Sequence, residues 1–213
     1  MKLTKFAHSC VRLDDGDRAL VIDPGIFADT ETALRGATAV LITHEHPDHV
    51  DEAAIRTAAV TDSGLTFWAP ASVAAKFDDL ADRFNVVEPQ QDLRVAGFDV
   101  RTFGGQHAVI HPLVPVVPNI AYLVNGSLLH PGDSFTVPPA PVETLLLPLH
   151  APWSKISEVI DFAVAVRAPR IHQIHDALLN DTGRSFVEAN VSRLTALYGC
   201  TYEYLSTGQA REL

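Results

Sequence analysis

The chain has 213 residues with 47% hydrophobic content, so we expect one globular domain, over residues 1–213, with its own core. Its 16 Lys and Arg against 26 Asp and Glu give a formal net charge of −10, which argues against a protein that grips a nucleic-acid backbone. No apolar run approaches the ~20 residues of a membrane span and no leader-like segment opens the chain, so we expect a cytoplasmic protein that does not enter a membrane.

The first half of the chain alternates short apolar runs with turns and Ala-rich stretches. Residues 4–13 are expected to form one or two strands and residues 18–22 another, joined by a turn at 14–17. The remaining expected elements are a short helix at 30–34, a strand at 39–43, a helix at 50–59, a strand at 65–68 and helical stretches at 70–76 and 79–84.

From residue 85 the pattern becomes richer in β-structure. Short strands are expected at 86–87, 93–95, 98–103, 120–124, 128–129 and 145–147. They are followed by a helix at 153–166 with Ser154 as N-cap, a strand at 170–174, a helix at 184–198 and a strand at 201–205. Two sheets packed face to face, with helices outside, are consistent with this order.

The stretch Thr43–His49, with the sequence THEHPDH, follows a buried apolar run and carries the strongest chemical signal. His44 and His46 stand two residues apart, so an extended or looped backbone can turn both imidazoles toward one point, whereas a helix would separate them by about 200°. Asp48 and His49 come next. Three imidazoles and a carboxylate suit two adjacent metal ions better than one, and the alternative is a polar turn that happens to be rich in histidine.

Three further candidate ligands each lie where an expected strand gives way to a loop. His107 follows a strand end with two glycines, Asp133 lies in the sequence HPGDS after a short strand, and His175 ends another β run. Layered folds place their sites where strand ends converge on one rim. A single histidine after a strand is more often a structural residue, so each of these signals is weak alone.

Together with the first cluster, these positions resemble the metallo-β-lactamase-fold hydrolases. The H-x-H-x-D-H signature of that family is met by residues 44–49, and its remaining ligand motifs are matched in the family's order by His107, Asp133 and His175. The resemblance covers nearly the whole chain. The opening stretch Phe6–Val11 is most similar to the small single-domain branch that includes relatives of L-ascorbate-6-phosphate lactonase.

The resemblance implies an α+β fold, a four-layer αββα sandwich, with two divalent cations as cofactors. One cation would be held by His44, His46 and His107, the other by Asp48, His49 and His175, with Asp133 as the bridge. Asp23 would be a carboxylate behind the ligands that accepts a ring N–H. We expect Zn²⁺ first, with Mn²⁺ or Fe open, since imidazole and carboxylate suit all three.

Such a site indicates metal-assisted hydrolysis. Two ions about 3.5–4 Å apart would share one water and lower its pKa, which supplies a bridging hydroxide as nucleophile. The expected enzyme cleaves an ester-like bond, lactone or phosphoester first, in a small molecule. Asp48 and Asp133 are its expected catalytic residues, with Asp48 as proton shuttle to the leaving group. A non-enzymatic metal-binding or regulatory domain and an iron-dependent oxygenase on the same ligands are the alternatives.

Several features stay open at this point. The roles of four residues are undecided: His8, His111, His150 and Trp153. The apolar, proline-rich segment 111–118 is either a wall of the substrate site, an oligomer contact or a rigid connector. His130 and His172 lie inside apolar runs and are expected to be core residues. Cys10 and Cys200 are expected to be free thiols, and the oligomeric state is open.

Overall fold

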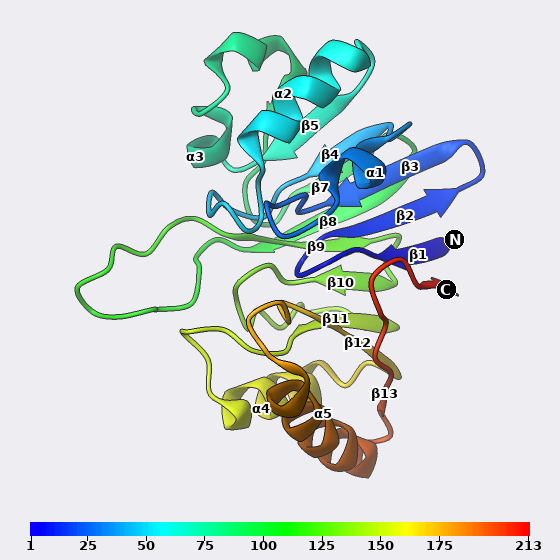
Figure 1. The fold of residues 1–213 in the computed structure, drawn as a ribbon, viewed down its shortest axis with the longest axis vertical. Coiled ribbons are helices and arrows are strands. Elements are labelled where there is room, and N and C mark those ends of the chain that lie inside the picture. Colours follow the sequence, from blue (N-terminus) through cyan, green and yellow to red (C-terminus); the bar gives the residue numbers. More distant parts are fainter.

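The structure, a computed structural model, describes residues 1–213 and contains two β-sheets that lie face to face (Figure 1). The first sheet has seven strands in the order β14 (Ala210–Glu212), β1 (Lys2–Lys5), β2 (Val11–Asp15), β3 (Arg18–Ile22), β4 (Ala39–Leu41), β5 (Thr66–Ala69) and β6 (Phe84–Val86). The second has seven in the order β13 (Thr201–Tyr202), β12 (Arg170–Ile174), β11 (Thr144–Pro148), β10 (Leu128–His130), β9 (Ile120–Val124), β8 (Phe98–Gly104) and β7 (Asp92–Val95).

Helices cover the outer face of each sheet, which confirms the expected α+β sandwich. The first sheet carries α1 (Thr30–Leu34), α2 (Glu52–Thr61), α3 (Ala71–Ala74) and the 3-10 helix η1 (Asp78–Arg83). The second carries α4 (Ile156–Val166), α5 (Asp181–Thr195) and the 3-10 helix η2 (Ala196–Tyr198). Figure 1 shows α2 and α3 at one end of the molecule and α4 and α5 at the other. None of the helices is both long and apolar enough to traverse a bilayer.

The apolar runs of the central strands are buried because both of their faces are covered. In β3, Leu20 and Ile22 point into the core between the sheets, whereas Val21 packs under the helices of the first sheet. In β11, Leu146 faces the core between the sheets, and its two neighbours in the strand pack under α4 and α5. Successive residues of a strand point to opposite faces, so a continuous apolar run fills two cores at once.

Strand direction brings several loops to the same edge of the molecule. β10, β11 and β12 are parallel, and β9 runs antiparallel to both β8 and β10, so β8, β10, β11 and β12 all end on one side. The end of β4 joins them across the sheets: the backbone N–H of Ile120 donates to the carbonyl of Thr43 at 2.9 Å, and the hydroxyl of Tyr122 donates to the carbonyl of Ile42 at 2.9 Å. The loops after these strands therefore meet.

Three expectations about the second half of the chain were wrong in detail. Lys155, not Ser154, precedes the first residue of α4, and the Ser154 hydroxyl instead accepts from the backbone N–H of Ala151 at 3.0 Å. α5 begins at Asp181, with Asn180 as its N-cap, and not at residue 184 as expected. Gly183 in its first turn is a poor helix former, so the sequence pattern did not indicate this earlier start.

The last expected strand, at 201–205, ends at Tyr202. The side chain of Gln173 replaces the missing strand contacts, since its amide donates to the carbonyl of Leu205 at 2.7 Å and accepts from the N–H of Leu205 at 3.0 Å. β14 was not expected from the sequence, because Ala210–Glu212 is short and partly charged and is a strand only through its pairing with β1.

Candidate metal centre

The segment that carries the histidine cluster leaves β4 as a tight turn. The carbonyl of His46 accepts hydrogen bonds from the backbone N–H groups of His49 and Val50, at 2.9 and 3.1 Å. The turn packs against Gly25, where a Cβ atom would lie 1.9 Å from the carbonyl oxygen of Asp48. Only glycine fits at such a contact, so Gly25 sets how closely the turn approaches the end of β3.

His44, His46 and His107 form a first group of potential ligands, and their donor atoms lie within 4.8 Å of one another. Nε2 of His44 is 3.1 Å from Nδ1 of His46. The ring centroid of His107 is 4.9 Å from that of His44 and 4.8 Å from that of His46. The ends of two strands in different sheets, β4 and β8, thus supply three imidazoles to one point.

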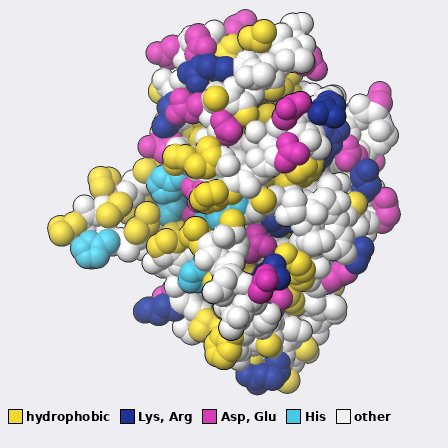
Figure 2. All heavy atoms as spheres, in the orientation of Figure 1, with side chains coloured by type: hydrophobic (Ala, Val, Ile, Leu, Met, Phe, Trp, Pro, Cys, Tyr) yellow, Lys and Arg dark blue, Asp and Glu magenta, His cyan; other side chains and the backbone are white.

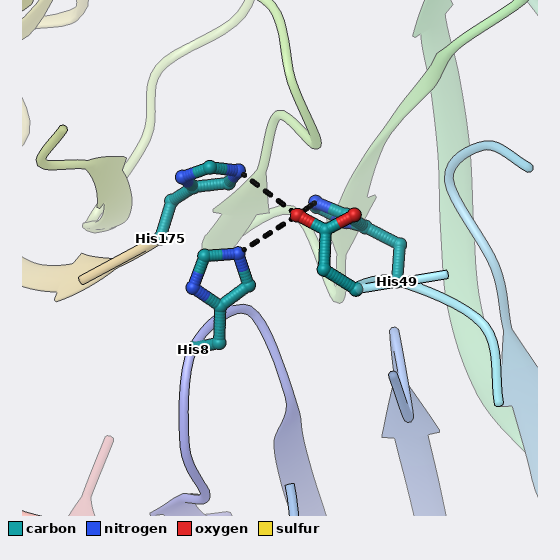
Figure 3. Close-up of side chains that lie close together, drawn as sticks. His8, His49 and His175 are labelled. Atoms are coloured by element: carbon teal, nitrogen blue, oxygen red, sulfur yellow. Dashed lines mark hydrogen bonds and ion pairs between the residues drawn. The ribbon is translucent and has the colours of Figure 1, made fainter. Parts of the chain in front are cut away.

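Asp48, His49 and His175 form a second group, which also includes His8. Oδ2 of Asp48 lies 3.9 Å from Nε2 of His49 and 3.5 Å from Nε2 of His175. Figure 3 shows His8, His49 and His175 converging from three separate segments. His175 has a φ of 55°, in the left-handed region that is uncommon for residues other than glycine, at the point where β12 ends. This backbone conformation directs its side chain into the group.

Asp133 lies between the two groups. Its Oδ1 is 3.1 Å from Nε2 of His49, and its Oδ2 is 3.3 Å from Nε2 of His107 and 3.1 Å from Nε2 of His175. Gly132 precedes it with a φ of +60°, and a Cβ atom there would lie 2.3 Å from Oδ1 of Asn119. The position therefore requires glycine for both its backbone conformation and its packing.

The second ring nitrogen of three of these histidines has a fixed partner. Nδ1 of His49 is 2.6 Å from Oδ2 of Asp23, Nδ1 of His107 is 2.6 Å from the Ala108 carbonyl, and Nδ1 of His175 is 2.7 Å from the His150 carbonyl. A carbonyl oxygen only accepts, so Nδ1 of His107 and of His175 carries a hydrogen. In the neutral ring this leaves the lone pair of Nε2 directed at the centre, the arrangement of histidine ligands of metals.

Several polar atoms at the centre lack a hydrogen-bond partner, which tests whether these residues fit a metal. Nε2 of His107, Nε2 of His175 and Oδ1 of Asp133 are buried and form no hydrogen bond of acceptable geometry. A buried polar atom without a partner costs about 1–3 kcal/mol. Imidazole nitrogen and carboxylate oxygen are both ligands of divalent metals in proteins, so a cation between these three atoms would supply the missing contact. The residues therefore fit metal binding.

In the absence of a cation, protons on the histidines would offset the negative charges of Asp48 and Asp133. Burial disfavours the charged form of His175, but the carboxylates of Asp133 and Asp48 outweigh it and raise the pKa of His175 to about 9. Burial also disfavours the charged form of His49, but the carboxylates of Asp133 and Asp23 outweigh it and raise the pKa of His49 well above its usual range. In His44, burial and the neighbouring His49 lower the pKa. A cation would thus compete with protons for His49 and His175.

Besides His8, two residues that the sequence left undecided contact this centre. The indole N–H of Trp153 donates to Oδ2 of Asp133 at 2.9 Å, and the carbonyl of His150 accepts from His175. In the sequence, only their position after an expected strand indicated that Trp153 and His150 lie near the site. That position did not predict which residues they contact. His111 lies apart: its Nδ1 accepts from the backbone N–H of Leu113 within an exposed loop.

His130 and His172 are buried and have structural partners. Nε2 of His130 donates to the carbonyl of Ser9 at 2.9 Å, and its Nδ1 accepts from the N–H of Gly132 at 3.2 Å. Nδ1 of His172 donates to the carbonyl of Glu203 at 2.8 Å. Both are core residues, as expected.

Apolar side chains surround the histidines on the surface. Figure 2 shows apolar atoms beside the histidines and along a projecting arm. Phe27, which is 44% exposed, places its ring centroid 5.1 Å from that of His8. Val109 and Leu113, on the loop that follows His107, are 60% and 86% exposed. The ion pairs of Asp48 and Asp133 are all with histidines, and the buried Lys5 pairs with Asp176.

The chain is similar in sequence to several known proteins. Residues 2–175 match the profile of the Beta-lactamase superfamily domain. Protein Rv0786c of Mycobacterium tuberculosis is 38% identical over 200 residues, which cover 92% of this chain and 93% of that protein. A UPF0173 metal-dependent hydrolase of Xanthobacter autotrophicus is 43% identical over 58 residues, 24% of this chain and 24% of that protein.

Solved structures share the fold at low sequence identity. Igni18, a metallo hydrolase from Ignicoccus hospitalis, has a TM-score of 0.75 and 16% identity over 100% of this chain and 98% of its own. CmlA, a diiron β-hydroxylase from Streptomyces venezuelae, has a TM-score of 0.76 and 13% identity over 100% of this chain and 54% of its own. At these identities the likeness concerns the fold alone.

Proposed function

The chain belongs to the β-lactamase superfamily and is a metal-dependent hydrolase, and from this premise we propose that it cleaves an ester-like bond in a small molecule at a centre of two divalent cations. A lactone or a carboxylic ester is the favoured substrate, ahead of a phosphoester. The observation that carries the proposal is the clustering of imidazole and carboxylate donors, several of whose buried atoms lack any other partner.

We assign His44, His46 and His107 to one cation, Asp48, His49 and His175 to the other, and Asp133 to a place between them. When bound, the cations would activate a water molecule near neutral pH and polarise the oxygen of the bond under attack. Zn²⁺ is the first choice, with Mn²⁺ or Fe as alternatives on a donor set of nitrogen and oxygen. The indole of Trp153 holds Asp133 in place through Oδ2.

Asp48 is the residue that we propose moves the proton. Its side chain is 23% exposed, against 4% for Asp133, so it is the carboxylate that a substrate can reach. Burial favours its neutral form, but the nearby imidazoles of His175 and His8, whose Nε2 atoms lie 3.5 and 3.1 Å from Oδ2, outweigh burial and hold the pKa of Asp48 well below its usual range. An ionised Asp48 can accept a proton from the attacking water and deliver it to the leaving group.

The surroundings of the centre favour a substrate with little charge. Phosphate groups are commonly held by Arg or Lys side chains, whereas the ion pairs of Asp48 and Asp133 here are all with histidines. The exposed apolar side chains of Phe27, Val109 and Leu113 suit an alkyl or acyl substituent. These two features support a lactone or a carboxylic ester more than a phosphoester.

A substrate panel tests this proposal. The protein, loaded in turn with Zn²⁺, Mn²⁺ or Fe²⁺, is assayed with lactones, carboxylic esters, phosphomonoesters and phosphodiesters. We expect turnover of at least one lactone or carboxylic ester, lost in His107→Ala and kept in the matched surface variant Val60→Ala, whose side chain is 84% exposed on α2. Two bound ions without turnover of any ester class would favour a regulatory domain, and oxygen uptake by the iron form would favour an oxygenase.

A further inference from the structure

His8 belongs to the second group of potential metal ligands, but its ring hydrogen is on the nitrogen that faces Asp48, unlike the ring hydrogen of His175. Its Nε2 is 3.1 Å from Oδ2 of Asp48 (Figure 3). Its Nδ1 accepts a hydrogen bond from the backbone N–H of Ala177 at 3.3 Å. A backbone N–H only donates, so Nδ1 is unprotonated and the hydrogen of the neutral ring is on Nε2. The lone pair that a cation would need at Nε2 is therefore replaced by an N–H directed at Asp48.

The backbone of His8 is held in a costly conformation. Its φ is 56°, in the left-handed region. Its carbonyl accepts hydrogen bonds from Nζ of Lys5 at 2.6 Å and from the backbone N–H of His175 at 3.3 Å. Lys5 is itself 2% exposed and pairs with Asp176 at 3.4 Å. Strain of this kind persists where several contacts enforce it, and it is typical of functional sites.

We propose that His8 is a positioning residue that donates its Nε2 hydrogen to Asp48 and orients this carboxylate toward the cation held with His49 and His175, without binding metal itself. The inference rests on the two-cation centre proposed above. A carboxylate oxygen has two lone pairs, so Oδ2 can accept from His8 and still face a cation. In this proposal, three of the four clustered residues, Asp48, His49 and His175, bind the cation, and His8 holds Asp48.

The tautomer of His8 can be measured before any metal is added. In metal-depleted protein with ¹⁵N-labelled histidine, at a pH where the ring is neutral, we expect His8 to show a protonated Nε2 and an unprotonated Nδ1. Addition of Zn²⁺ should leave this pattern in place. A hydrogen on Nδ1, or a change at Nε2 to the signal of a metal-bound nitrogen, would overturn the proposal. The measurement on metal-free protein does not depend on the proposed function.

Two variants test the effect on metal binding. His8→Gln keeps an N–H donor at the reach of Nε2, whereas His8→Phe keeps a ring and removes the donor. In Zn²⁺ titrations of metal-depleted protein, we expect His8→Phe to weaken the binding of one of the two ions by about 10–100-fold and His8→Gln to restore most of that loss. Binding of the other ion should be unchanged. Unfolding of each metal-free variant is recorded as a control for folding.

Each outcome separates the possible roles. Native-like binding of both ions by His8→Phe would show that His8 has no positioning role. Complete loss of one ion in both variants would make His8 a ligand and also overturn the inference. If the native protein itself took up only one ion, the two-cation centre would fail, and with it the orienting role, while the ¹⁵N measurement would still decide whether His8 donates to Asp48. Should His8→Phe not fold, His8→Gln and the ¹⁵N signals still decide.

Discussion

Replacement of Asp23 by Asn should weaken both the fold and the metal centre. Asp23 is fully buried at the end of β3 and accepts hydrogen bonds from the backbone N–H and the hydroxyl of Thr43, each at 2.7 Å, and from Nδ1 of His49 at 2.6 Å. Asn has nearly the same shape and tolerates the φ of 50° at this position. The substitution therefore removes a charge and one accepting oxygen and leaves the backbone unstrained.

The magnitude follows from the contacts that are lost. Removal of one member of a buried, hydrogen-bonded charge pair typically costs about 3–5 kcal/mol, because the remaining partner stays buried without compensation. We therefore expect Asp23→Asn to lower the free energy of unfolding of the metal-free protein by about 3–5 kcal/mol at pH 6, where His49 is protonated in both states. Loss of the contact behind His49 should also weaken metal binding by about 10–100-fold.

Urea unfolding followed by circular dichroism measures the first effect, and metal titration measures the second. Asp92→Asn is the matched control, because Asp92 also pairs with a cationic side chain, Arg101, but is 79% exposed. Exposed pairs contribute little to stability. A change in Asp23→Asn no larger than that in Asp92→Asn would refute the account of how His49 is held.

Other residues of the centre give three further predictions. Gly132→Ala should destabilise the protein by at least ~2 kcal/mol more than Gly126→Ala in urea unfolding, because both glycines have a φ of +60° but only at Gly132 would a Cβ meet atoms within 4 Å. Equal losses in the two variants would contradict the packing described around Gly132. The raised pKa of His175 contributes stability to the metal-free protein below the ordinary histidine pKa of ~6.5, and this stability is lost as pH rises through about 9. Unfolding curves and Zn²⁺ titrations from pH 6 to 10 should show the stability falling while the affinity for Zn²⁺ rises, and an affinity that does not change with pH would contradict this prediction. Asp48→Asn, at saturating metal, should lower kcat by about 10²–10⁴-fold, and full turnover with full metal content would remove its proposed role in proton transfer.

The local part of the centre could be predicted from the sequence because its spacing is short. Residues 44–49 lie in one turn, and the apolar strand before them identifies where that turn begins. The sheets were predictable for a similar reason: the runs in β3 and β11 are apolar on both faces and thus indicate buried strands. β14 has no such pattern, and its pairing with β1 comes from the opposite end of the chain.

The contacts of His8 and Trp153 at the candidate centre could not be predicted, because they join segments that are distant in the chain. The backbone N–H that fixes the tautomer of His8 belongs to Ala177, which is 169 residues away in the chain. The partner of Trp153 is Asp133, on a different loop. Neither contact leaves a periodic or spaced pattern in the sequence.

We propose that metal ligands from residue 44 to residue 175 surround two cations. Anomalous diffraction from crystals grown with Zn²⁺ tests it most directly. We expect two peaks about 3.5–4 Å apart, one beside His44, His46 and His107 and the other beside Asp48, His49 and His175. A single peak, or peaks away from Asp133, would contradict the account.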